Sequence, residues 1–332
     1  MVIDYLFHLD FIYLFLCTVN YQFSNLETLL LVCLFHFSSA TGRKLNELVQ
    51  DPPAVPLLYH DGPLLSGQIS VNLIWYGNFK PAQRDIVSDY FNSLYITPKS
   101  TQSPSVSLWW KKVEKYYNLP YSSEKPTSLV LKSGRQILDN KYSLGKSLNN
   151  KKIVRLASRG EQSNAINVVL TSADVTVDGF CSGRCGTHGS SYSASKKTKF
   201  AYIWVGNSEI QCPGQCAWPF HQTIYGPQGS PLVAPNNDVG IDGMVINLAS
   251  LLAGTATNPF GNGYYQGPAG GSLEVSSACT GIYGKGAYPG YPGNLLVDSS
   301  TRANYNANGA NRRKYLLPAL FDHSTSTCCT LV

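Results

Sequence analysis

The sequence DVGIDGMVINLASLLAGTATNP, at residues 238–259, is a long and almost continuously apolar stretch. It predicts a helix from Gly243 to about Thr257, which Asp242 caps and Asn258-Pro259 ends. Apolar side chains fall on nearly every side of this helix: Met244, Val245, Ile246, Leu248, Leu251, Leu252 and Ala253. A helix without a polar face is buried. The rest of the chain must therefore supply the layers that cover it.

Three segments upstream of this helix predict strands of the covering sheet. Ile166–Leu170 and Phe200–Val205 are continuous apolar runs of strand length, which is typical of central strands. Ile69–Tyr76 alternates apolar residues with polar Ser70 and Asn72, so it predicts a half-buried strand.

Helical patterns separate these strands. Pro81 suits the first turn of a helix with one apolar face. Ser103-Pro104 precedes a second helix that carries Trp109 and Trp110, for which we favour core packing over stacking on sugar rings. Leu129–Arg159 predicts a short strand and a basic helix. Together these elements predict an α+β fold: a single, loop-rich domain built on a mixed sheet.

The first 42 residues differ from the rest, because they contain three acidic residues and no Lys or Arg. Leu29–Phe37 has the length of a signal-peptide core, and Ser38-Ser39-Ala40 supplies small residues for cleavage after Ala40. We predict a signal peptide with an N-terminal extension at residues 1–40, an extended arm at 41–66 and a folded domain at 67–332. The protein is expected to be secreted, with no stable membrane span after leader cleavage. An uncleaved anchor is the alternative, and it would need Arg43 and Lys44 on the cytoplasmic side.

Seven cysteines follow the leader, and their spacing allows two interpretations. Two C-x3-C pairs, a lone cysteine and a C-terminal pair fit a secreted framework of three disulfides with one thiol left over. The residues concerned are Cys181, Cys185, Cys212, Cys216, Cys279, Cys328 and Cys329, and one of the last two is expected to pair with Cys279. Zinc is the alternative, because His188 and His221 follow the two C-x3-C pairs. We favour disulfides, since thiolates do not persist in an oxidising compartment.

The chain after the leader is basic. It carries 26 Lys and Arg against 17 Asp and Glu, once the three acidic residues of the leader are subtracted from 20, and its net charge is +9. Short basic clusters at 196–199 and 312–314 match no nucleic-acid-binding motif, so no nucleic-acid partner is predicted. Acidic cell-surface polysaccharide is a better candidate partner for this positive charge. The alternative is that the basic residues form an ordinary solvated surface without a partner.

Several motifs of known catalytic sites are absent from the sequence. It contains no G-x-S-x-G, no H-E-x-x-H, no P-loop and no G-x-G-x-x-G after a strand, and no carboxylate pair stands out. No catalytic residue, cofactor or metal is therefore predicted.

Five segments form long motifs: FCSGRCGTHG at 180–189, CPGQCAWPF at 212–220, DVGIDGMV at 238–245, NPFGNGYY at 258–265 and RKYLLP at 313–318. They closely resemble the plant EXORDIUM family, also called the phosphate-induced proteins, from about Gly42 to Val332. The resemblance implies an extracellular protein of the apoplast and cell wall that is linked to cell expansion and brassinosteroid-dependent growth. Cys329 stands where the family pattern has a basic residue, which implies that it is the unpaired thiol.

The predicted order of elements also resembles that of zinc-dependent peptidases of the zincin type, whose last helix carries H-E-x-x-H. The matching positions here are Ser250, Leu251 and Gly254, which cannot hold zinc, and Glu274 is a candidate relic of a third ligand. We hypothesise a degenerate metallopeptidase topology with a non-catalytic cleft that binds wall polysaccharide or a cell-surface receptor. The alternative is a wall-modifying hydrolase with an unrecognised active site.

Overall fold

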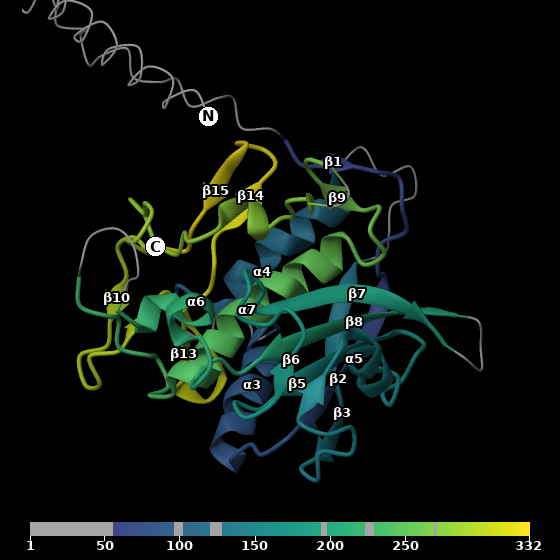
Figure 1. Cartoon of the computed structure of the whole chain (residues 1–332). Coiled ribbons are helices and arrows are strands. Elements are labelled where there is room, and N and C mark those ends of the chain that lie inside the picture. Colours follow the sequence, from purple (N-terminus) through teal and green to yellow (C-terminus); the bar gives the residue numbers. More distant parts are fainter. Residues whose placement is uncertain (1–55, 96–101, 120–127, 194–197, 223–228, 269–270) are drawn as a thin grey trace, which may run out of the picture. The chain divides into compact units, whose positions relative to one another are not determined.

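A mixed sheet with helices on both of its faces forms the core of the domain in the computed structural model (Figure 1). The sheet has five strands. Its strand order is β3 (Leu129–Asp139), β2 (Gly67–Tyr76), β5 (Ala165–Thr171), β8 (Lys199–Gly206) and β7 (Gly186–Tyr192). The first four strands are parallel, and β7 runs antiparallel to β8 at one edge. The predicted α+β class with a mixed sheet is confirmed.

The structure describes residues 56–95, 102–119, 128–193, 198–222, 229–268 and 271–332. The predicted leader, its cleavage after Ala40 and most of the arm predicted at 41–66 lie outside these ranges. The described end of the arm forms β1 (Leu58–Tyr59), which pairs with β9 (Tyr264–Tyr265), and Leu57 is buried in the core. Residues 54–332 make one compact unit.

Helices cover both faces of the sheet (Figure 1). On β2, Val71, Leu73 and Trp75 point into a core shared with α3 (Pro81–Ser93), α4 (Val106–Glu114) and α7 (Val239–Thr257). Ile74 and Tyr76 point the other way, into a core shared with α5 (Asn150–Ala157). The prediction that this strand is half-buried is therefore wrong, because a parallel strand at the centre of a sheet is covered on both sides.

Asn72, the polar residue that suggested an exposed face, is fully buried and paired across the sheet. Its Nδ2 donates to Asn167 Oδ1 on β5 at 2.9 Å, and its Oδ1 accepts from the backbone N–H of Arg135 at 2.9 Å. Asn167 Nδ2 in turn donates to the carbonyl of Glu161 at 2.8 Å. Buried amides are tolerated when they are paired in this way, and the pair also fixes the register of β2 against β5.

Replacing Asn167 with alanine is expected to lower the free energy of unfolding by about 2 kcal/mol, because Asn72 would keep a buried amide without its partner. Ser70→Ala is the matched control: it also removes a polar group from β2, but from a partly exposed site. That change should stay within about 0.5 kcal/mol of the wild type. Urea unfolding followed by circular dichroism measures both values, and equal losses in the two variants would contradict the importance of the amide pair.

Helix α7 is the apolar helix predicted from the sequence, but it begins earlier than expected. Its N-cap is Asp238, whose side chain accepts from the backbone N–H of Ile241 at 2.9 Å. Asp242, the predicted cap, instead lies buried in the first turn. By length and composition α7 would be able to span a membrane, yet most of it is buried inside this domain, so it is the core helix that the sequence predicts.

The helices before α7 follow the sequence patterns closely. α3 begins at Pro81, and α4 continues into a 3₁₀ turn at Lys115–Asn118. Trp109 and Trp110 are each 1% exposed, which confirms core packing rather than a stacking surface.

Short elements complete the domain. They are β4 (Ser147–Leu148) with β6 (Thr176–Val177), β10 (Leu296–Val297) with β11 (Asn304–Tyr305), β12 (Ala307–Asn308) with β13 (Lys314–Tyr315), β14 (Leu320–Asp322) with β15 (Thr327–Cys329), the one-turn helix α6 (Pro213–Cys216), and 3₁₀ turns at Trp218–Phe220, Ser277–Cys279 and Ala310–Arg312.

Three disulfides cross-link the loops of the domain: Cys181–Cys212, Cys185–Cys216 and Cys279–Cys328. The first two join the segment that leads into β7 to α6, so the C-x3-C pairs bond to each other rather than to zinc. The third joins a 3₁₀ turn to β15, and Cys329 is the free cysteine among the described residues.

Candidate functional site

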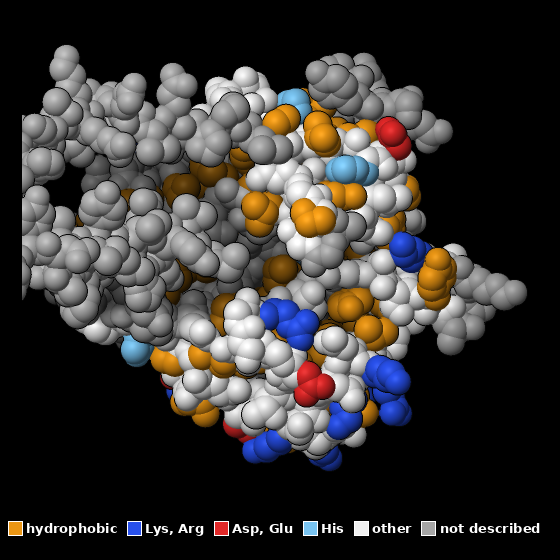
Figure 2. Space-filling view, turned by 45° about the horizontal axis from the view of Figure 1, so that its top comes forward, with side chains coloured by type: hydrophobic (Ala, Val, Ile, Leu, Met, Phe, Trp, Pro, Cys, Tyr) orange, Lys and Arg blue, Asp and Glu red, His pale blue; other side chains and the backbone are white. Residues whose placement is uncertain are grey.

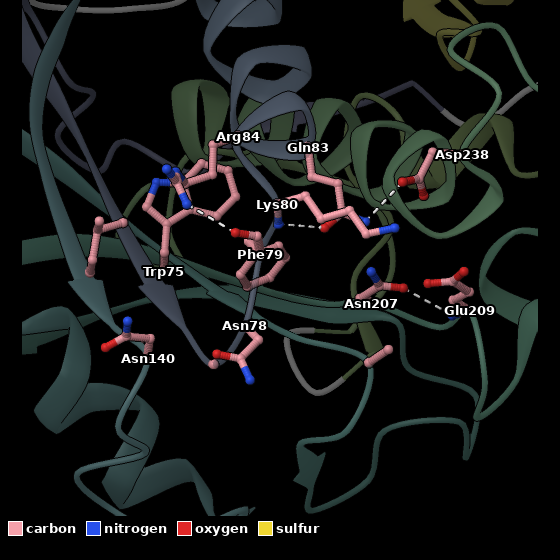
Figure 3. A pocket seen from close by; sticks show the side chains of 13 residues that line it. Trp75, Asn78, Phe79, Lys80, Gln83, Arg84, Asn140, Asn207, Glu209 and Asp238 are labelled. Carbon is pink, nitrogen blue, oxygen red and sulfur yellow. Dashed lines mark hydrogen bonds between the residues drawn. The ribbon is translucent and has the colours of Figure 1, made fainter.

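The loops that follow β2, β3, β5 and β8 meet at one edge of the sheet and line a pocket of about 410 Å³ (Figure 3). Asn78 follows β2, Asn140 follows β3 and Asn207 follows β8, while α3 begins at the same edge with Lys80 as its N-cap. Parallel strands place their carboxyl ends together, and ligands of open α/β sheets bind at that edge. We call this the sheet-edge pocket.

Asp238 lies on one side of the sheet-edge pocket with both carboxylate oxygens engaged. Its Oδ1 caps α7 through Ile241, and its Oδ2 accepts from Gln83 Nε2 at 2.8 Å (Figure 3). A carboxylate held in this way is a structural group of the wall and is poorly placed to act as a base.

Cationic and amide groups remain free for a ligand. Arg84 donates one bond, from Nη1 to the carbonyl of Phe79 at 2.9 Å, which leaves most of its N–H groups available. Lys80, Asn78 and Asn140 are exposed, and neither asparagine side chain has a hydrogen-bond partner among the described residues. The pocket thus offers two cationic groups and amides that both donate and accept, beside the carboxylates of Glu209 and Asp238.

The described lining of the sheet-edge pocket has no Ser, Thr, Cys or His side chain. It therefore lacks a hydroxyl or thiol nucleophile beside a base, the arrangement that covalent hydrolysis uses.

Figure 2 shows basic side chains over the lower part of one face of the molecule, with few acidic ones among them.

The residues of the hypothesised degenerate cleft lie elsewhere, beside β7. Leu251 and Glu274 line a second hollow of about 440 Å³, which we call the β7 groove. Gly254 lies against it, since a Cβ there would collide with the carboxylate of Glu274. Ser250 does not line the groove, so the structure brings together three of the four proposed positions.

His188 on β7 completes this cluster. Its Nε2 lies 2.7 Å from Glu274 Oε2, and Asn258 Nδ2 donates to Glu274 Oε1 at 2.7 Å. The Glu274 carboxylate thus occupies the space next to Gly254 and is held there from two sides. Sequence reasoning considered His188 only as a zinc ligand beside Cys181 and Cys185, because the contact with Glu274 spans 86 positions.

Among the residues that the structure describes, no three His, Cys, Asp or Glu side chains are grouped so that they could hold a metal ion. In the described lining of the β7 groove, His188 and Glu274 are the two residues of these types, and they contact each other.

A sequence profile of the phosphate-induced protein 1 conserved region matches residues 57–331. The chain belongs to this plant family. It is 66% identical to the protein PHOSPHATE-INDUCED 1 of Nicotiana tabacum over 307 residues, which cover 92% of this chain and 97% of that one. It is also 66% identical to the protein EXORDIUM of Arabidopsis thaliana over 299 residues, covering 89% and 95%. The names of these relatives state no enzymatic activity, and no solved structure is significantly similar to the chain.

Two of the motifs that first indicated the EXORDIUM family line the β7 groove. The motif at 180–189 supplies Gly186 to Gly189, and the motif at 258–265 supplies Asn258 to Gly261. A third, at 212–220, forms α6 and its two disulfides with the segment before β7. Recognisable stretches of this EXORDIUM-family chain therefore build and brace the groove.

The asparagines of the sheet-edge pocket were missed as site residues. The available signal was that each lies within two residues of the end of a strand, and Gly77-Asn78 was interpreted only as a strand end. The pocket becomes visible once the strands are known to be parallel neighbours.

Proposed function

We propose that this EXORDIUM-family protein is a secreted protein of the plant cell wall that binds acidic wall polysaccharide without cleaving it, in the sheet-edge pocket. The observation that carries the proposal is that Lys80, Arg84 and the side-chain amides of Asn78 and Asn140 line one pocket, whose described lining has no hydroxyl or thiol nucleophile. A uronic acid sugar presents a carboxylate and neighbouring hydroxyls, which match a guanidinium and amides respectively. The link to cell expansion and brassinosteroid-dependent growth is carried over from the family resemblance.

Secretion to the apoplast is supported by the disulfides and by the signal-peptide pattern. Three bridges among the seven cysteines that follow the predicted leader fit an oxidising compartment. In the wall the chain would meet acidic polysaccharide, and its net charge of +9 after the leader would favour that encounter.

A wall-modifying hydrolase is the alternative, because Glu209 and Asp238 both line the sheet-edge pocket and glycosidases use paired carboxylates. The two hydrogen bonds that Asp238 accepts weigh against it, since they fix the carboxylate between the start of α7 and Gln83. We therefore prefer binding to cleavage.

The zincin-like topology is a further part of the proposal. Helix α7 packs beneath β7 and β8, which is where a zincin places its metal-binding helix under an antiparallel edge strand. Ser250, Leu251 and Gly254 supply no ligand on that helix. The chain would then be a peptidase-like scaffold without a catalytic centre, and a cell-surface receptor remains a candidate partner for it.

Calorimetric titration with oligogalacturonate tests the binding proposal. Arg84→Ala is expected to weaken binding by about tenfold or more, because it removes a charge-assisted bond. Lys151→Ala, which removes an equal charge from the exposed side of α5, should leave the affinity unchanged. Some binding should persist at about 0.5 M salt, where purely ionic attraction is screened.

Two outcomes would contradict the proposal. Equal weakening by Arg84→Ala and Lys151→Ala would show a diffuse charge effect, and no binding at all would remove the ligand class. Release of new reducing ends during incubation with the polymer would favour the hydrolase instead.

A further inference from the structure

One edge of strand β7 pairs with no other described strand, and the hydrogen-bonding groups on that edge can be assigned from the register of β7 with β8. The backbone N–H of Ser193 donates to Thr198, and that of Gly206 donates to Cys185, at the two ends of the ladder. Bonded and non-bonded pairs alternate in an antiparallel ladder. The residues between these ends therefore alternate too, and Gly186, His188 and Ser190 direct their N–H and C=O groups away from β8.

No other strand of the described chain pairs with this edge. Outward groups on every second residue repeat at about 7 Å, which is the repeat of an extended peptide chain. An added strand would thus meet the bonding groups of β7 in register.

The β7 groove is lined by this same edge strand. Its lining includes Gly186 to Ser190 of β7, Asn258 to Gly261 of a following loop, and Leu251 of α7, which lies against Gly186. Backbone groups for a main chain and a hollow for its side chains therefore lie next to each other.

The charged residues of the groove indicate which side chain of a bound peptide it would favour. Glu274 and His188 are the ionisable residues of its described lining, and Lys and Arg are absent from that lining. His188 and Asn258 each bond one oxygen of Glu274 and fix the carboxylate in place, and Gly254 leaves room for it. His188 Nδ1 is buried and has no partner among the described residues. An acidic group held beside an open strand edge complements a basic side chain.

We infer that the β7 groove binds an extended peptide segment of a partner protein, which adds as a strand to β7 and directs a Lys or Arg side chain towards Glu274. The site is separate from the sheet-edge pocket, so it does not depend on polysaccharide binding.

The register supplies a precise test. Proline at position 190 would remove an outward N–H while every bond to β8 is kept, and proline is accepted on edge strands in that orientation. Ser190→Pro should therefore keep the fold, whereas Ser190→Ala removes only the hydroxyl. Glu274→Gln keeps the shape of the groove and removes its charge.

The probe is a phage-displayed library of random octapeptides, selected on the full protein. We expect enriched peptides to share a Lys or Arg, to bind Ser190→Ala like the wild type, and to bind Ser190→Pro at least tenfold more weakly at an unchanged melting temperature. Replacing the shared Lys with norleucine should weaken binding to the wild type several-fold more than to Glu274→Gln.

Several results would overturn the inference. These are the absence of enrichment, equal binding to Ser190→Pro and Ser190→Ala, displacement of the peptides by oligogalacturonate, and a Ser190-dependent dimer that blocks the groove. If Ser190→Pro does not fold, the test rests on Glu274→Gln. If Lys-to-norleucine replacement in the peptide then weakens binding to Glu274→Gln as much as to the wild type, the proposed contact with Glu274 is refuted.

Discussion

Replacing Cys279 and Cys328 together with serine is expected to lower the free energy of unfolding by about 4 kcal/mol. The bridge between them closes a loop with a sequence separation of 49, and its loss would free that loop in the unfolded chain. It would also release β15 from the core, where Cys328 packs. Urea unfolding at fixed pH measures the loss.

The adjacent Cys329 provides the control, because it differs from Cys328 by one position and by its partner. Its Sγ lies 3.0 Å from Lys112 Nζ and makes no disulfide. Cys329→Ser should therefore change the free energy of unfolding by no more than about 0.5 kcal/mol. Alkylation of the unreduced, denatured protein should label Cys329 and not Cys328, and the reverse labelling would show that the pairing is wrong.

Raising the pH from about 4 to about 7 is expected to destabilise the protein through one buried carboxyl group, that of Asp242. Burial raises the pKa of Asp242 from 3.8 to about 7, although both oxygens accept from Asn236, at 2.8 and 2.6 Å. Between these values the unfolded chain has lost the proton and the folded chain still holds it. Stability therefore falls as the pH rises through this window, by about 4 kcal/mol in total at 1.36 kcal/mol per pKa unit.

Asp242→Asn should remove this slope, because the amide does not titrate. Asp85→Asn, on the exposed side of α3, should keep it. Chemical unfolding at half-unit steps from pH 4 to 8 measures all three proteins. A slope that Asp242→Asn leaves unchanged would refute the assignment to this residue.

Two other carboxyl groups act in the opposite direction at lower pH. Hydrogen bonds from Ser324 and Lys115 lower the pKa of Asp322 to about 2, and bonds from Lys146, Ser172 and Tyr142 outweigh burial to lower that of Asp174 to about 2. Their contribution is complete above about pH 4 and is lost as the pH falls towards 2. The combined expectation is a stability maximum in mildly acidic solution.

The core of the fold was predictable because buried strands and helices have apolar patterns that can be recognised within a short stretch of sequence. The continuous apolar runs of β5 and β8 and the all-round apolar surface of α7 each require cover, whatever lies next to them. The cap of α7 was misassigned because DVGID offers two aspartates four residues apart, and only the backbone conformation separates them. The burial of Asn72 was not predictable either, since its partner is 95 positions away.

The candidate sites depend on such distant contacts even more strongly. The sheet-edge pocket joins residues from Trp75 to Asp238, and the β7 groove joins Gly186 to Glu274. No local pattern marks either one, because exposed amides and glycines also occur in ordinary turns. The hypothesis of a degenerate cleft did name Glu274, but it drew on the resemblance to zincins.

Helix α7 has a consequence for biosynthesis. If the protein is exported as proposed, its nascent chain crosses a membrane before the sheet exists to cover this helix. Val239–Thr257 then passes through the translocation channel as a segment long and apolar enough to insert. Its one charged residue, Asp242, lies in the first turn, where a charge opposes insertion least. On the far side, folding against the sheet then buries this segment, as it is buried in the finished domain.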